Sequence, residues 1–352
     1  MNYNYNRTGG GRSRRRRRQK MMKTVILSLV VVLIIGGFVA FLFALKNIGE
    51  KAREKETESE SLYESIETGP QDTVSGVLQE GFITKKYESA ELHRGDLILV
   101  SADAPYVFPE EEDLENLYTG RKKYENGARP FQVSGSDIWL DSFVFSKLSE
   151  MTECFYETTG ENALLVKSGY RSYEAQKEIL DYRIERDGEE EALKYAARPG
   201  ESEHHTGKAF DMSVYKNGVN TYIEDEPDYV WIYENAHKYG FVLRYPESKA
   251  EITGIAYEAW HFRYVGVPHA YYMYSEGIVL EEYLELLKKQ YAYDDVHLRI
   301  DCDDGNKYEI YYVPASSEGS AEIILPAGYE YSVSGNNMDG YIVTVLVSRG
   351  EK

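Results

Sequence analysis

The hydrophobic pattern sets one stretch near the N-terminus apart from the rest of the 352-residue chain. Residues 24–45 are almost entirely apolar and carry no charge, which is long enough to cross a bilayer as one helix. Residues 1–23 before it hold nine Lys and Arg and no acidic residue. The positive-inside rule therefore predicts a cytoplasmic basic tail, a transmembrane anchor and a chain outside the membrane beyond residue 45.

A cleaved signal peptide is the alternative for this apolar run. Signal cores span only ~7–15 residues and are followed by a small-residue cleavage site, whereas residues 39–45 offer a poor cleavage context. The pattern thus favours an uncleaved, single-pass anchor. Its arginine-rich flank could suggest a nucleic-acid patch, but beside a membrane helix it is better explained as a topology signal that also contacts anionic lipid.

Beyond the anchor, the pattern predicts three further regions. Residues 46–75 are charged and poor in large apolar side chains, as expected of a polar stalk. Residues 76–292 mix helical and strand periodicities, which predicts an α+β domain. Its helices are expected at 137–157, 173–186, 231–239 and 280–290, with strands at 164–166, 208–214 and 241–245 and short strands within 83–100. Residues 293–352 contain five strand-like runs between turn residues and predict a small all-β domain.

Charge and cysteine content narrow the possible partners. Without the nine basic residues up to Lys23, 31 Lys and Arg stand against 59 Asp and Glu, a formal charge of −28. A domain of that charge has no general electrostatic attraction for nucleic acid. The two cysteines, Cys154 and Cys302, could form a disulfide outside the membrane or remain two structural thiols. They do not resemble a thiolate zinc site.

Two short segments carry the candidate chemistry. His204 and Asp211 are seven residues apart with Gly207 between them, a spacing that suits a turn leading into a strand rather than one helix face. With His261 they offer two imidazoles and a carboxylate, the three protein ligands of a catalytic zinc site with an open fourth position. Glu258 precedes His261 by three residues and could accept a proton from water beside the metal.

Alternatives remain open at the level of spacing. His205 could replace His204 as the ligand. Sets of three Asp, His and Glu residues also arise by chance in a chain of this length. Arg171 has a planar guanidinium that fits a substrate carboxylate or a developing negative charge, yet it could equally pair with a surface Glu.

The pattern S-x-H-x-x-G-x-A-x-D followed by E-x-W-H resembles the VanY-type D-alanyl-D-alanine carboxypeptidases, zinc peptidases of family M15 (subfamily M15B). Further blocks of the same family pattern occur in the same order, so the resemblance covers roughly residues 80–290. These blocks are Ser168-Gly-Tyr-Arg-Ser-Tyr-Glu-Ala-Gln176, Gly240-Phe-Val-Leu-Arg-Tyr-Pro246, Thr253-Gly254 and Trp260-His-Phe-Arg-Tyr-Val-Gly266.

The resemblance implies a domain with a small antiparallel sheet, similar to hedgehog and D,D-peptidase domains, and a role for each matched position. It implies that His204, Asp211 and His261 bind Zn²⁺ and that Glu258 is the catalytic base. Arg171 would hold substrate and stabilise the oxyanion, and Ser202 and Gln176 would lie near the substrate. The chain departs from the family at His205, where Gln is usual, and at Ala259, where Pro is frequent. Neither change removes a catalytic atom.

The expected function is that of a bacterial cell-membrane zinc carboxypeptidase. It would remove the terminal D-Ala of peptidoglycan stem peptides with zinc-activated water, outside the cytoplasm, and would have no nucleic-acid partner. An L,D-carboxypeptidase acting on tetrapeptide stems, an endopeptidase and an inactive wall-binding module are the alternatives.

Overall fold

The computed structural model describes residues 81–350. The predicted basic tail, anchor and stalk lie outside these residues. Within 81–350, none of the helices combines the length and apolar character that a membrane crossing requires.

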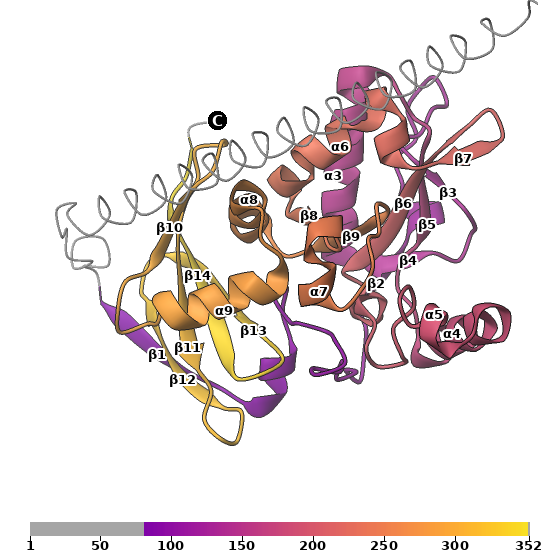
Figure 1. Cartoon of the computed structure of the whole chain (residues 1–352). Coiled ribbons are helices and arrows are strands. Elements are labelled where there is room, and N and C mark those ends of the chain that lie inside the picture. Colours follow the sequence, from indigo (N-terminus) through magenta and orange to yellow (C-terminus); the bar gives the residue numbers. More distant parts are fainter. Residues whose placement is uncertain (1–80, 351–352) are drawn as a thin grey trace, which may run out of the picture. The chain divides into compact units, whose positions relative to one another are not determined.

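A six-stranded sheet forms the centre of the predicted peptidase domain (Figure 1). Five strands follow the order β3-β5-β6-β9-β8, and β7 pairs with β6 beside them. All pairs are antiparallel except β3 with β5. The strands are β3 (Gln132–Val133), β5 (Leu164–Ser168), β6 (Ala209–Lys216), β7 (Val219–Thr221), β8 (Phe241–Leu243) and β9 (His261–Tyr264). With the helices around it, this sheet confirms the α+β prediction.

Helix α3 (Ser142–Thr159) supplies much of the core beside this sheet. Asp141 begins the helix by accepting hydrogen bonds from the backbone N–H groups of Phe143 and Val144, and Gly160 ends it in the left-handed conformation. Its buried face includes Leu148 and Phe155, and full burial of such a side chain contributes about 1.5–3 kcal/mol. The predicted start at residue 137 was too early, because β4 (Trp139–Asp141) pairs there with β2 (Leu114–Asn116).

Helix α4 (Tyr173–Asp187) confirms the prediction for 173–186. The Ser172 hydroxyl accepts from the N–H of Ala175, and Gly188 follows the last turn. The short helix α5 (Glu189–Ala192) packs against α4. The predicted helix at 231–239 is divided into α6 (Trp231–Asn235) and a 3-10 turn, η6 (Ala236–Tyr239). The remaining short helices are α2 (Leu117–Gly120) and α7 (Ala250–Thr253).

The C-terminal region is rich in strands, as predicted, but it is not a separate unit. Four strands form a sheet in the order β10-β11-β14-β13, and β12 pairs instead with β1 (Phe82–Tyr87) from the start of the described chain. Residues 81–350 belong to one compact unit. The strands are β10 (Leu298–Asp301), β11 (Lys307–Pro314), β12 (Ala321–Pro326), β13 (Glu330–Gly335) and β14 (Gly340–Ser348).

A shared apolar core explains why the predicted boundary at residues 292 and 293 does not divide the structure. Buried side chains of α8 (Val267–Glu276) and α9 (Leu280–Gln290) pack in one cluster with Leu298, Ile310 and Ile342 of the C-terminal sheet. Cys154 is half-buried and Cys302 is buried, and both are free thiols.

Candidate metal centre and catalytic cavity

The register of the central sheet brings the two sequence motifs together. Asp211 on β6 lies opposite His261 on β9 and opposite Ser168 on β5. His204 lies on a 3-10 turn, η3 (Glu203–Thr206), which Gly207 ends with φ of +67°. A Cβ at Gly207 would lie 3.0 Å from the backbone nitrogen of Asp141. Glycine therefore permits both the left-handed turn between His204 and β6, which carries Asp211, and the close packing of this turn against the Asp141 backbone.

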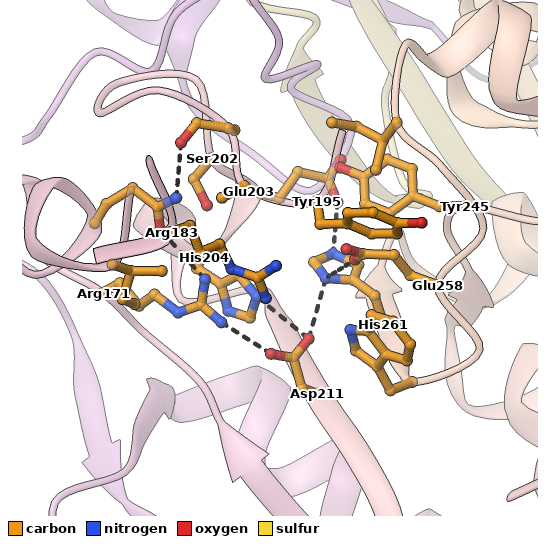
Figure 2. Close-up of a pocket in the computed structure, with 16 residues that line it drawn as sticks. Arg171, Arg183, Tyr195, Ser202, Glu203, His204, Asp211, Tyr245, Glu258 and His261 are labelled. Carbon is orange, nitrogen blue, oxygen red and sulfur yellow. Dashed lines mark hydrogen bonds and ion pairs between the residues drawn. The ribbon is translucent and has the colours of Figure 1, made fainter. Parts of the chain in front are cut away.

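Three side-chain atoms converge at this point (Figure 2). His204 Nε2 lies 3.4 Å and His261 Nδ1 lies 3.3 Å from Asp211 Oδ1. The opposite ring nitrogens are held by the protein, since His204 Nδ1 lies 2.7 Å from the carbonyl oxygen of Gly169 and His261 Nε2 lies 3.3 Å from Glu203 Oε2. Such outer partners fix the tautomer of a metal-binding histidine and orient its ring.

The donor set fits a metal ion. Asp211 Oδ1 is buried and receives no hydrogen bond from residues 81–350, whereas its Oδ2 accepts from Ser168 Oγ at 2.7 Å and from Arg171 at 2.8 Å. A buried carboxylate oxygen without a donor is costly, and a cation would compensate it. Two imidazole nitrogens and one carboxylate oxygen are a ligand set that zinc favours.

The protonation of the two histidines is consistent with such a site. Burial, with Arg171 nearby, lowers the pKa of His204 to about 4, so its ring is neutral and can offer a lone pair. Burial also opposes a charge on His261, but the nearby carboxylates of Asp211 and Glu203 outweigh it and raise its pKa to about 9. A carboxylate pair that draws a proton onto His261 would equally attract a metal cation.

Glu258 lies beside the three converging atoms. Its Oε2 is 3.6 Å from His261 Nδ1, and its side chain lines the same cavity. Burial raises the pKa of its carboxyl to about 7, while His261 opposes this rise and Asp211 adds to it; Arg171 and Arg183 are further charges that oppose it. A carboxylate that exchanges a proton near neutral pH is suited to general acid–base work.

Arg171, Gln176 and Ser202, which the family resemblance places near the substrate, all line this cavity. The guanidinium of Arg171 donates to Asp211, Ser168 and Gln176. The Gln176 side chain is fully buried and donates to the carbonyl oxygen of Ala197 at 2.8 Å. Arg171 and Gln176 are therefore engaged in positioning Asp211 and the cavity wall. Their predicted contacts with substrate stay a prediction.

Sequence reasoning missed Glu203, which the fold buries almost completely. Its carboxylate lies 2.8 Å from Arg244 Nε, 3.1 Å from Arg263 Nη1 and 3.3 Å from His261 Nε2. Burial raises the pKa of this carboxyl, but the two guanidinium groups outweigh it and hold the pKa well below its usual range. Its position next to His204 was the only sequence signal. Sequence reasoning also missed Arg183 and Tyr195 in the cavity wall.

His205 is excluded as the ligand by its own contacts. Its Nε2 accepts from the N–H of Gly200 at 3.0 Å, and its Nδ1 lies 2.7 Å from the carbonyl oxygen of Arg171. Both ring nitrogens are thus used within the fold. The extra imidazole ties two loops together rather than facing the metal site.

This contrast between neighbouring histidines gives a direct test. His204→Ala is expected to abolish near-stoichiometric zinc binding, because one of three protein ligands is lost. His205→Ala is expected to keep zinc while losing some stability. Elemental analysis after dialysis against buffered zinc would measure both. Retention of zinc by the His204 variant, with loss in the His205 variant, would reverse the assignment.

Comparison with known proteins identifies the family. The family model described as VanY, D-alanyl-D-alanine carboxypeptidase, matches residues 137–267. A D-alanyl-D-alanine carboxypeptidase of Enterococcus faecium is 34% identical over 268 residues, covering 76% of this chain and 79% of that protein. The chain belongs to the VanY family. As a VanY-family protein it is a peptidase and hence a hydrolase.

Solved structures are similar to this VanY-family chain. The vancomycin-resistance D,D-dipeptidase VanXYg, in complex with a D-Ala-D-Ala phosphinate analog, shares 32% identity with a TM-score of 0.65, over 76% of this chain and 99% of that one. A mutant of the D,D-pentapeptidase VanY from a VanB-type resistance cassette, in complex with Zn(II), shares 32% identity with a TM-score of 0.41, over 54% of this chain and 98% of that one.

Proposed function

We propose that this VanY-family peptidase is a membrane-anchored zinc carboxypeptidase that removes the terminal D-Ala of peptidoglycan stem peptides. One observation carries the proposal: a buried carboxylate oxygen without a donor, Asp211 Oδ1, lies between two ligand-type nitrogens with Glu258 beside them. His204, Asp211 and His261 would hold zinc.

When bound there, zinc would supply Lewis-acid chemistry toward a water molecule and the carbonyl group of the scissile bond. Glu258 then accepts the proton of the attacking water and delivers it to the leaving amine. The fold contributes by keeping His204 and His261 in fixed tautomers through Gly169 and Glu203. Arg171 holds Asp211 in place and adds positive charge to the wall where the oxyanion develops.

The proposed location rests on the N-terminal sequence. An anchor at 24–45 with a basic cytoplasmic flank would place the peptidase outside the cytoplasm, and residues 46–75 would act as a polar stalk. Peptidoglycan stem peptides lie on that side of a bacterial membrane.

A defined substrate pair tests the function. The full-length chain, purified in detergent and loaded with zinc, is incubated with muropeptides that end in a pentapeptide or a tetrapeptide, with and without a chelator. D-Ala release from the pentapeptide that the chelator abolishes is the expected result. Release from the tetrapeptide alone would indicate an L,D-carboxypeptidase. No chelator-sensitive release despite bound zinc would leave a wall-binding module.

A further inference from the structure

Arg183 is a cationic side chain in the catalytic cavity that the mechanism leaves unused. It lies near the C-terminal end of α4, is half-buried and lines the cavity together with Glu258 and His261. Figure 2 draws Arg183 and Arg171 on the side of the cavity opposite Glu258. The charge of Arg183 nevertheless acts on the Glu258 carboxylate.

The two cavity arginines differ in what they bind. Arg171 is bonded to Asp211, Ser168 and Gln176, whereas Arg183 makes no hydrogen bond or ion pair with any residue in 81–350. Arg186, one turn further along α4, is exposed and pairs with the neighbouring Asp187. The donors of Arg183 are therefore free for a ligand inside the cavity.

The chemistry of a guanidinium indicates which ligand it takes. Its planar fork fits a carboxylate through two parallel hydrogen bonds. A carboxypeptidase substrate differs from an internal peptide segment by a free carboxylate, one residue beyond the scissile carbonyl. The cavity holds about 90 Å³, which suits one small residue beyond that bond. We propose that Arg183 binds the C-terminal carboxylate of the substrate and thereby selects chain ends. This inference rests on the proposed carboxypeptidase function.

Removal of the Arg183 guanidinium should slow hydrolysis of a peptide with a free C-terminal carboxylate but not of the same peptide as an amide. The full-length zinc enzyme is assayed on an N-acylated peptide ending in D-Ala-D-Ala, once as the free acid and once as the C-terminal amide. Arg183→Ala is expected to lower kcat/KM for the acid about 10- to 100-fold, mainly through KM, because a hydrogen-bonded charge pair is lost. The slow reaction of the amide should stay unchanged, so the ratio of kcat/KM for the acid to kcat/KM for the amide should fall.

Two matched variants control for charge and folding. Arg186→Ala removes the same charge from the exposed surface of α4 and should leave both substrates unaffected. Arg183→Lys retains a charge without the fork and should recover part of the activity on the acid. An equal loss on acid and amide, or no loss on the acid, would overturn the proposal.

A binding measurement separates this inference from the proposed function. Calorimetric titration of both peptides into Glu258→Gln protein, with and without Arg183→Ala, needs no turnover. The acid should bind about 10- to 100-fold more weakly without Arg183, and the amide equally well. If the wild-type enzyme hydrolyses neither peptide, the proposed function fails, and this titration still decides on Arg183. Equal acid affinity with and without Arg183 would overturn the inference alone.

Discussion

Glu258→Gln is expected to lower kcat on a pentapeptide about 10²- to 10⁴-fold, the range that a positioned general base contributes. The amide keeps the size of the side chain but cannot accept the proton of the attacking water. Glu258 lies 3.6 Å from His261 Nδ1 without belonging to the three converging ligand atoms, so zinc content should stay unchanged. Steady-state release of D-Ala and elemental analysis of the same sample measure both quantities.

A second glutamate provides the control for this substitution. Glu251 on α7 is exposed and lies outside the cavity wall, so Glu251→Gln should leave kcat unaffected. Full activity of the Glu258 variant would contradict the role of this residue as base. Loss of zinc together with activity would instead make Glu258 a ligand.

Glu203→Gln is expected to destabilise the protein by about 3–5 kcal/mol, the cost of leaving buried charges without a partner. Glu203 is 1% exposed and stands between the buried guanidinium groups of Arg244 and Arg263. Arg244 keeps a second partner in Glu281, at 2.7 and 2.9 Å, whereas the other hydrogen bonds of Arg263 within residues 81–350 go to backbone carbonyl groups. Denaturant unfolding of the zinc-free protein would measure the change.

The same substitution should weaken zinc binding about 10- to 100-fold, the usual effect of losing a carboxylate behind a metal-binding histidine. The reason is that Glu203 holds Nε2 of His261, whose Nδ1 faces the metal site. Competition with a zinc chelator measures this affinity. Glu322→Gln, an exposed change on β12, is the matched control for both readouts. Unchanged stability and unchanged zinc affinity would contradict both roles of Glu203, as partner of the buried arginines and as the group that orients His261.

Hydrophobic periodicity and capping residues correctly predicted the helices whose ends are set by their own sequence. The α9 helix begins and ends at residues 280 and 290 as its periodicity indicated, and α4 lies between Ser172 and Gly188, which are capping residues visible in the sequence. Pairing between distant segments produced the differences. Residues 139–141, predicted as helix, form strand β4, which pairs with β2. Strand β1 pairs with β12 across the predicted boundary between two domains.

The site shows the same division. His204, Asp211, His261 and Glu258 carry motif spacing, and the sheet brings them together. Glu203 and Arg183 carry no such signal, because charged residues at these positions also suit a solvent-exposed surface. Only the burial of Glu203 between two arginines and the absence of a partner for Arg183 within 81–350 distinguish them.

X-ray absorption spectroscopy at the zinc edge of the full-length protein most directly tests whether His204, Asp211 and His261 bind zinc. The expected result is near-stoichiometric zinc with only nitrogen and oxygen neighbours at about 2.0–2.2 Å, including the scattering of two imidazole rings. In His261→Ala protein, as in His204→Ala protein, near-stoichiometric zinc binding should be lost, because one of three protein ligands is removed. A sulfur neighbour at about 2.3 Å, or a zinc shell without imidazole, would contradict a centre formed by His204, Asp211 and His261.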